Sequence, residues 1–245
     1  MVIDPIPPQE KRGGVMFPIE GNCWMVMLVG QVGDYAPSDE EGFLAYARSL
    51  SVPDIYEIIK VGIPESPIVS YRYPASRWRH YERMFSLPNG LIVMGDALCS
   101  FNPAYGQGIA IAAMEAKRLA VFLHERQQQI THGTLNQPGG WTQRIQRSLA
   151  DIVRDPWKLA ISNDFRYPQN TGRRPFGTHL FNWYMRRVHE AMAFNSSATL
   201  RGYEVLTLSK PLRTLFEPHI VWEVLRQSLR LHLSCSKRIN DENIA

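Results

Sequence analysis

Short apolar runs alternate with amphipathic stretches in the first part of the chain, which predicts strands mixed with helices. Val15–Ile19 and Trp24–Gly30 are apolar runs separated by Glu-Gly-Asn, a spacing typical of a β-hairpin with a short turn. Ser38, with a glutamate three residues later, has the form of a capping box and predicts the start of a helix. A second short helix is expected from Pro53, and a further strand over Ile68–Tyr73.

Later in the chain, apolar positions recur mainly at helical spacing. Residues 106–125 carry small apolar side chains in their first half, as a helix packed closely on a sheet requires. Residues 126–140 have few apolar positions and two turn signals, so we expect a loop there. Helices are then expected over 142–155, where a proline follows, over 178–192 and over 218–233. The last third of the chain is therefore predicted to be helical.

The composition is that of an ordinary globular protein. The chain has 245 residues, 44% of them hydrophobic and 20% charged, which is enough for one large domain or two small ones. Its three cysteines, Cys23, Cys99 and Cys235, are widely spaced and suggest neither a disulfide framework nor a metal site. No apolar run reaches the roughly eighteen residues of a membrane span. Residues 1–20 contain prolines and charges where a signal peptide has an apolar stretch. We therefore expect a cytoplasmic protein without an integral membrane segment.

Charge is distributed unevenly along the chain. Residues 141–238 hold sixteen Lys and Arg against seven Asp and Glu, a net charge of +9, and the remaining residues have a net charge of −5. A basic region of this kind suits an anionic ligand, an anionic membrane surface or nucleic acid, although a solvated helix surface is the commonest explanation. No nucleic-acid-binding module is recognised, so we expect no nucleic acid partner.

One stretch near the middle of the chain has the pattern of a ligand-binding strand, turn and helix. Leu91–Met94 predict a short buried strand that ends in Gly-Asp, and Gly-Gln-Gly then opens the predicted helix. The first N–H groups and the dipole of a helix favour an anionic ligand, and glycines let that ligand approach the backbone. An aspartate at the strand end can accept hydrogen bonds from hydroxyl groups, although Gly-Asp also ends many strands that simply turn. The candidate cofactor-binding residues are Gly95, Asp96, Asn102, Pro103, Gly106, Gln107 and Gly108.

Gly95-Asp96, Pro103, Gly106-Gln107-Gly108 and Glu115 together resemble the second FAD-contacting motif of flavoproteins similar to p-hydroxybenzoate hydroxylase, the aromatic-ring hydroxylase class. The likeness is close over residues 88–124 and looser elsewhere. It implies an α/β, Rossmann-like FAD/NAD(P)-binding fold and a monooxygenase that uses FAD, NAD(P)H and O2 on a small organic substrate. In this class the aspartate holds the ribityl chain and the helix start faces the flavin N1/O2 edge. No side chain is named as a catalytic acid or base, because the cofactor carries the hard chemistry.

The same class has an N-terminal Gly-x-Gly-x-x-Gly fingerprint for the ADP half of FAD, and this sequence does not contain it. The resemblance therefore implies the C-terminal portion of such an enzyme. Because a half-site lacks the contacts to the pyrophosphate, we expect the isolated chain to bind FAD weakly. The expected organisation is a partial substrate-side sheet with helices over 1–85, an FAD-contacting strand, loop and helix over 86–125, a loop over 126–140 and a helical part over 141–245.

Other interpretations remain open. The chain is alternatively a non-catalytic remnant, or a subunit that needs an N-terminal flavoprotein half in trans. A reductase or halogenase on the same scaffold is a further alternative. Five basic residues precede the motif: Arg72, Arg77, Arg79, His80 and Arg83. Their position before the motif favours one or two that face a cofactor or substrate, and the alternative is a set of surface residues paired with local carboxylates.

Overall fold

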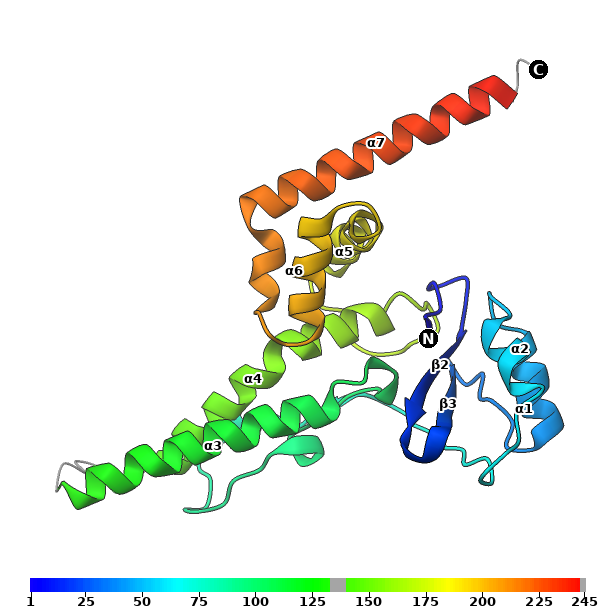
Figure 1. Cartoon of the computed structure of the whole chain (residues 1–245). Helices are drawn as coiled ribbons and strands as arrows, with labels where there is room; N and C mark the ends of the chain where they lie inside the picture. Colours follow the sequence, from blue (N-terminus) through cyan, green and yellow to red (C-terminus); the bar gives the residue numbers. More distant parts are fainter. Residues whose placement is uncertain (133–139, 243–245) are drawn as a thin grey trace. The chain divides into compact units, whose positions relative to one another are not determined.

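The structure, a computed structural model, describes residues 1–132 and 140–242, with side chains described as far as residue 230 (Figure 1). The chain divides into two compact units. One unit comprises Met1–Ala75 and Asn163–Arg173, and the other comprises Ser76–Ser162 and Arg174–Ala245. Both contain helices and short strands, so the mixed α/β class expected from the sequence is confirmed. The described strands form two small antiparallel sheets.

A three-stranded antiparallel sheet is the framework of the first unit. Strands β2 (Arg12–Ile19) and β3 (Cys23–Gly30) pair along their whole length, and the short 3-10 helix η1 (Glu20–Asn22) connects them. β1 (Val2–Ile3) pairs with the other edge of β2. Gly21 takes a φ of +76° in the connection, a conformation that glycine adopts without steric cost. The predicted hairpin is therefore confirmed.

Two short helices pack on this sheet, α1 (Glu40–Arg48) and α2 (Asp54–Ile59). The N-cap of α1 is Asp39, whose carboxylate accepts a hydrogen bond from the N–H of Gly42 at 2.7 Å. The predicted start at Ser38 is thus wrong by one residue. The shift follows from chemistry, because an aspartate caps a helix as well as a serine does and adds a negative charge beside the positive helix end.

The strand predicted over Ile68–Tyr73 is wrong, since residues 63–76 contain neither helix nor strand. Val69 and Tyr71 are 88% and 75% exposed, so the apolar positions of this run do not face a core. A strand needs a neighbour that takes up its backbone hydrogen bonds, and the described sheets provide none for this run.

Residues 163–173 belong to the same unit because their side chains bind the beginning of the chain. The guanidinium of Arg166 donates to the carbonyl of Pro7 at 3.1 Å, and the hydroxyl of Tyr167 donates to the carbonyl of Glu10 at 2.8 Å. The Tyr167 ring is buried. These bonds satisfy two carbonyls in the extended residues that lead into β2.

Two long helices dominate the second unit and lie side by side (Figure 1), α3 (Gly108–Thr131) and α4 (Trp141–Asp164). The predicted helix after the glycine motif is confirmed, but α3 continues to Thr131, so the loop expected from residue 126 is wrong over residues 126–131. Residues 133–139 of that predicted loop lie outside the described residues. An apolar cluster joins the two helices and includes Leu98, Phe101, Ile111, Ile145, Leu149 and Val153.

Helix α4 passes through Pro156, where the sequence predicted an end. A proline inside a helix removes one hydrogen bond and costs about 3 kcal/mol. Pro156 is buried, and the neighbouring Asp155 carboxylate accepts a hydrogen bond from the N–H of Leu212 at 2.9 Å. Packing and this long-range bond therefore offset the local cost of the proline.

The C-terminal residues form a helical cluster around a second apolar core that includes Tyr184, Val188, Ala198, Leu215 and Ile220. The helices expected over 178–192 and from residue 218 are confirmed. The helix over 196–206 was not predicted, and its N-terminus is capped by Asn195, whose side chain accepts from Ala198 N–H at 2.9 Å. The elements are α5 (Thr178–Met192), α6 (Ser196–Leu206), η5 (Leu212–Phe216) and α7 (Pro218–Glu242). Over the described residues, none of the helices combines the length and the apolar character that crossing a bilayer demands.

Candidate functional site

The stretch predicted as a buried strand is held by side chains and not by a sheet. Leu91–Met94 are assigned to no strand, so this prediction is wrong. The Gln146 side chain of α4 replaces a neighbouring strand: its Oε1 accepts from Val93 N–H at 3.0 Å, and its Nε2 donates to the Val93 carbonyl at 2.8 Å. One turn earlier on α4, the Thr142 hydroxyl accepts from Gly90 N–H at 3.1 Å. The segment thus leads into the Gly-Asp pair with its backbone bound to α4.

A tight turn follows, the 3-10 helix η3 (Gly95–Ala97). Gly95 has a φ of +60°, in the left-handed region that favours glycine, and its carbonyl accepts from Leu98 N–H at 2.9 Å. The guanidinium of Arg79 donates to the carbonyls of Asp96 and Ala97 at 3.2 and 3.3 Å. Of the five predicted basic residues, Arg79 therefore binds the motif, and it does so through the backbone.

A two-stranded sheet brings Arg79 to the turn. β4 (Arg77–Trp78) pairs with β5 (Cys99–Ser100), and the N–H of Arg79 donates to the carbonyl of Leu98 at 2.9 Å. Burial raises the pKa of the Cys99 thiol to about 12, and the negative charges of Glu115, Asp96 and Glu82 add to this rise. The thiol therefore stays protonated near neutral pH and acts as a packed core group.

Glu115 holds the same turn from α3. Its side chain is 0% exposed, and its Oε2 accepts from Gly95 N–H at 2.5 Å. Ile111, one helical turn earlier, is also buried, so this carboxyl group lies on the inner face of α3. Burial raises the pKa of Glu115, the bond from Gly95 lowers it, and the negative charge of Asp96 raises it. Within the described residues Oε1 has no hydrogen-bond partner.

The loop between the turn and α3 is shaped by Asn102 and by η4 (Pro103–Tyr105). The Asn102 carbonyl oxygen Oδ1 accepts from Ala104 N–H at 3.1 Å, and Pro103 occupies the first helical position, where a missing N–H costs nothing. Gly106 ends η4 with a φ of +65° and donates its N–H to the Pro103 carbonyl at 3.0 Å. The predicted loop residues Asn102, Pro103 and Gly106 are thus used to build the approach to α3.

In the part of the chain that the structure describes, the first turn of α3 has no side-chain cap. Gln107 occupies the N-cap position, but its amide donates to the carbonyl of Leu206 in α6 at 3.0 Å. The first N–H groups of α3 carry the positive end of the helix dipole. Among the described residues, no atom lies within 4 Å of the Cβ position at Gly95, Gly106 or Gly108, apart from the chain neighbours and, at Gly108, the backbone of its own helix. The backbone at the helix start is therefore open to a ligand.

The predicted residues thus belong to one unit, in which η3 packs against α3 and Asp96 is exposed. An exposed carboxylate can accept hydrogen bonds from hydroxyl groups, and an uncapped helix start can stabilise a negative charge. Sequence reasoning missed Arg79 as a backbone ligand, Glu115 as a holder of the turn, and Gln146. For Glu115 and Gln146 the available signal was a polar residue on the apolar face of a helix.

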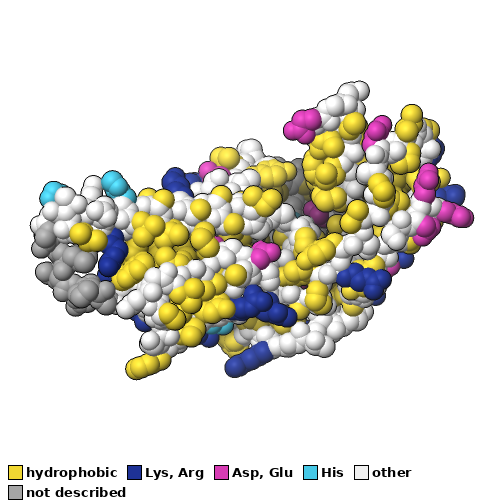
Figure 2. Space-filling view, turned by 90° about the horizontal axis from the view of Figure 1, so that it is seen from below, with side chains coloured by type: hydrophobic (Ala, Val, Ile, Leu, Met, Phe, Trp, Pro, Cys, Tyr) yellow, Lys and Arg dark blue, Asp and Glu magenta, His cyan; other side chains and the backbone are white. Residues whose placement is uncertain are grey.

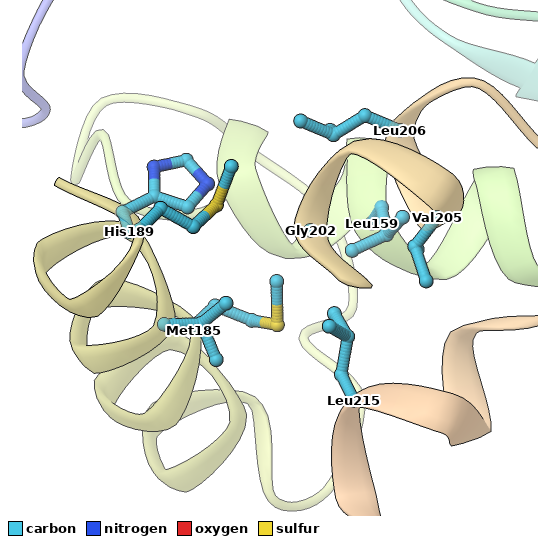
Figure 3. Close-up of a pocket in the computed structure, with 9 residues that line it drawn as sticks. Leu159, Met185, His189, Gly202, Val205, Leu206 and Leu215 are labelled. Atoms are coloured by element: carbon cyan, nitrogen blue, oxygen red, sulfur yellow. The ribbon is translucent and has the colours of Figure 1, made fainter. Parts of the chain in front are cut away.

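A small apolar hollow lies among the C-terminal helices (Figure 3). Met185, Val205 and Leu215 point into it from three elements, and Gly202 of α6 forms part of its wall. The remaining space is on the order of one water molecule, and its lining offers almost no polar surface. The hollow is too small for an organic substrate as it stands. Among the described residues no group of three or more His, Cys, Asp or Glu is placed to hold a metal ion.

No family model matches the chain. The chain is similar to protein Rv3254 of Mycobacterium tuberculosis (strain H37Rv), with 24% identity over 182 residues. These residues cover 72% of this chain and 37% of that protein, so the chain spans little more than a third of the length of its relative. The relative's name states no activity. The likeness to aromatic-ring hydroxylases therefore stays a prediction from the motif.

Proposed function

We propose that this chain forms the flavin-ring side of an FAD-dependent oxidoreductase, an NAD(P)H- and O2-using monooxygenase acting on a small organic substrate. In this proposal Asp96 accepts hydrogen bonds from ribityl hydroxyls, and the start of α3 faces the N1/O2 edge of the flavin. When bound, the flavin would supply the redox chemistry between NAD(P)H, O2 and the substrate. The residues of this chain bind and orient the cofactor.

One observation carries the proposal: an exposed aspartate and an uncapped, glycine-lined helix start are built into the same packed unit. Apart from its chain neighbours and the backbone of its own helix, a Cβ at Gly108 would have no atom of the described residues within 4 Å. The glycine is therefore not required by internal packing, which supports close approach of a ligand at this point. A reduced flavin carries negative charge near N1, and the positive end of a helix dipole stabilises such a charge.

Exposed apolar residues on α3 favour the hypothesis that a partner binds there and completes the cofactor site. Ala110, Ala113, Met114 and Val121 share this face with Lys117 and are exposed, while another face of the helix is buried against α4. Figure 2 shows hydrophobic side chains exposed on the face of the protein that it views. Several exposed apolar side chains on one face of a helix favour a surface that a partner covers. We propose that an N-terminal flavoprotein half, with the pyrophosphate-binding glycine motif, covers this face and completes a Rossmann-like sheet.

A Gly108→Ala substitution tests the flavin site. Because Gly108 lies at the first position of α3 with open space around it, the added methyl group leaves stability unchanged or raises it by up to about 1 kcal/mol. The same methyl group would stand between the flavin and the backbone. We expect FAD affinity, followed by quenching of flavin fluorescence, to fall at least tenfold while the melting temperature does not fall.

Asp96→Ala gives an independent readout at the same site. Hydrogen bonds to a charged group contribute about 1.5–3 kcal/mol each, so loss of this carboxylate would weaken FAD binding by at least tenfold. Asp151→Ala is the matched control, because Asp151 is an exposed aspartate of the same unit on α4. Unchanged FAD binding in both Gly108→Ala and Asp96→Ala would refute the proposed site.

Coexpression distinguishes two hypotheses, that the chain is one half of an active enzyme or that it is a non-catalytic remnant. The chain would be produced alone and together with an N-terminal flavoprotein half that contains Gly-x-Gly-x-x-Gly. If tight FAD binding and NAD(P)H oxidation occur only when both are present, the subunit that needs its partner in trans is supported. If the complex forms and holds no flavin, the chain is a non-catalytic partner. Val121→Lys on the exposed face of α3 should prevent the complex without unfolding the chain, because Val121 is 49% exposed.

A further inference from the structure

The turn that carries Asp96 is held from two sides by oppositely charged side chains. Arg79 donates to the carbonyls of Asp96 and Ala97, and Glu115 accepts from the N–H of Gly95. The two side chains come from different parts of the chain, Arg79 from beside β4 and Glu115 from α3. The cation therefore binds the carbonyl oxygens at one end of the turn, and the carboxyl group binds the N–H at the other end.

The contact with Glu115 is the buried one of the two. Arg79 is exposed, whereas the side chain of Glu115 is closed off from solvent on the inner face of α3. Removing a carboxyl group from water is costly unless the group makes a strong hydrogen bond. Within the described residues, the Glu115 carboxyl group accepts its hydrogen bond from Gly95, the residue whose positive φ starts the turn. A leucine at this position would fill the same face of α3 at no desolvation cost, so the carboxyl group has a specific use.

We propose that Glu115 is a positioning residue that fixes the Gly95–Ala97 turn and thereby presents Asp96 at the entrance of α3. The bond spans 20 residues and ties the turn directly to the helix whose first amides form the other half of the site. This inference rests on the proposed flavin function for its consequence, but the positioning itself concerns only the protein. Glu115 does not touch the ligand in this arrangement.

Substitutions of Glu115 in the full chain test this role by two readouts. The first is the Gly95 amide, whose chemical shift and hydrogen-exchange rate report the bond without any ligand. The second is FAD affinity, measured with the form of the protein that binds FAD. We expect Glu115→Ala to speed exchange at Gly95 and to weaken FAD binding, each at least tenfold. Glu115→Gln keeps an acceptor oxygen at the same distance and should restore both values to within about threefold of wild type.

Two further variants make the outcome decisive. Glu125→Ala removes an exposed glutamate from the same helix and should change neither readout. Glu115→Asp is one methylene group shorter and should lose the protection of Gly95, which decides the question if Glu115→Ala does not fold. Equal Gly95 protection in wild type, Glu115→Asp and Glu115→Ala would overturn the positioning role. If the wild-type protein binds no FAD in any form, the proposed function fails, and the Gly95 amide still decides whether Glu115 holds the turn.

Discussion

Replacement of Gln146 by methionine should destabilise the second unit substantially, because the side chain is fully buried and makes two hydrogen bonds to one residue. Methionine matches the length and volume of glutamine, so packing is largely kept and the change isolates the polar contacts. The N–H and carbonyl of Val93 would both lose their partner. A buried backbone group left unsatisfied costs about 1–3 kcal/mol. Val93 is half-buried, so water compensates in part, and we expect a loss of about 2–4 kcal/mol.

Urea unfolding followed by tryptophan fluorescence measures this loss. Trp78 and Trp157 pack against each other with ring centroids 5.7 Å apart in the same apolar cluster, so their emission reports this unit. Gln128→Met is the matched control, because Gln128 is exposed on α3 and its substitution should change stability by less than about 0.5 kcal/mol. If both variants unfold at the same urea concentration as wild type, Gln146 does not replace a strand neighbour and the account of residues 91–94 fails.

Three further predictions concern buried polar groups. The folded-state pKa of Glu115 is raised above its usual 4.5. The protonated carboxyl group therefore makes its full contribution to the free energy of unfolding below about pH 4.5, and this contribution is lost as the pH rises through the folded-state pKa. The free energy of unfolding of wild type should therefore fall relative to Glu115→Gln over that range, and parallel urea-derived curves would contradict this. Cys99, buried and with a pKa of about 12, should resist iodoacetamide at pH 8 in the folded protein while the half-buried Cys23 reacts, as mass spectrometry of the alkylated peptides would reveal. Tyr184→Phe removes a buried hydrogen bond of 2.5 Å to the Leu215 carbonyl and should cost about 1–3 kcal/mol in thermal or urea unfolding.

The arrangement of the candidate site depends on contacts that join distant residues. Gln107 was predicted to face a cofactor, yet its side chain binds the carbonyl of Leu206, 99 residues away. Asn102 was predicted beside the cofactor and caps η4 through Ala104 N–H. Only a folded α6 can place the Leu206 carbonyl beside the helix start, so periodicity and composition contain no information on this bond.

Several elements of the fold follow from local signals in the sequence. The hairpin of Arg12–Ile19 with Cys23–Gly30, the helix that follows Gly-Gln-Gly and the start of the last helix at Pro218 were all predictable. Each depends on residues within a few positions of one another: apolar alternation, a short turn, or helical spacing next to a proline or glycine. Such patterns act through backbone geometry and need no distant partner.

Tertiary structure alone decided whether the apolar runs became strands and what holds the turn at Gly95. Leu91–Met94 has the composition of a strand, but its hydrogen bonds come from Gln146, 53 residues beyond Val93. Glu115 reaches Gly95 because α3 folds back against the turn that precedes it. A strand exists only where a second chain segment supplies its backbone partners, and a buried carboxyl group is tolerated only where the fold offers it a donor. Both conditions are properties of the packed molecule and cannot be found in any local stretch of sequence.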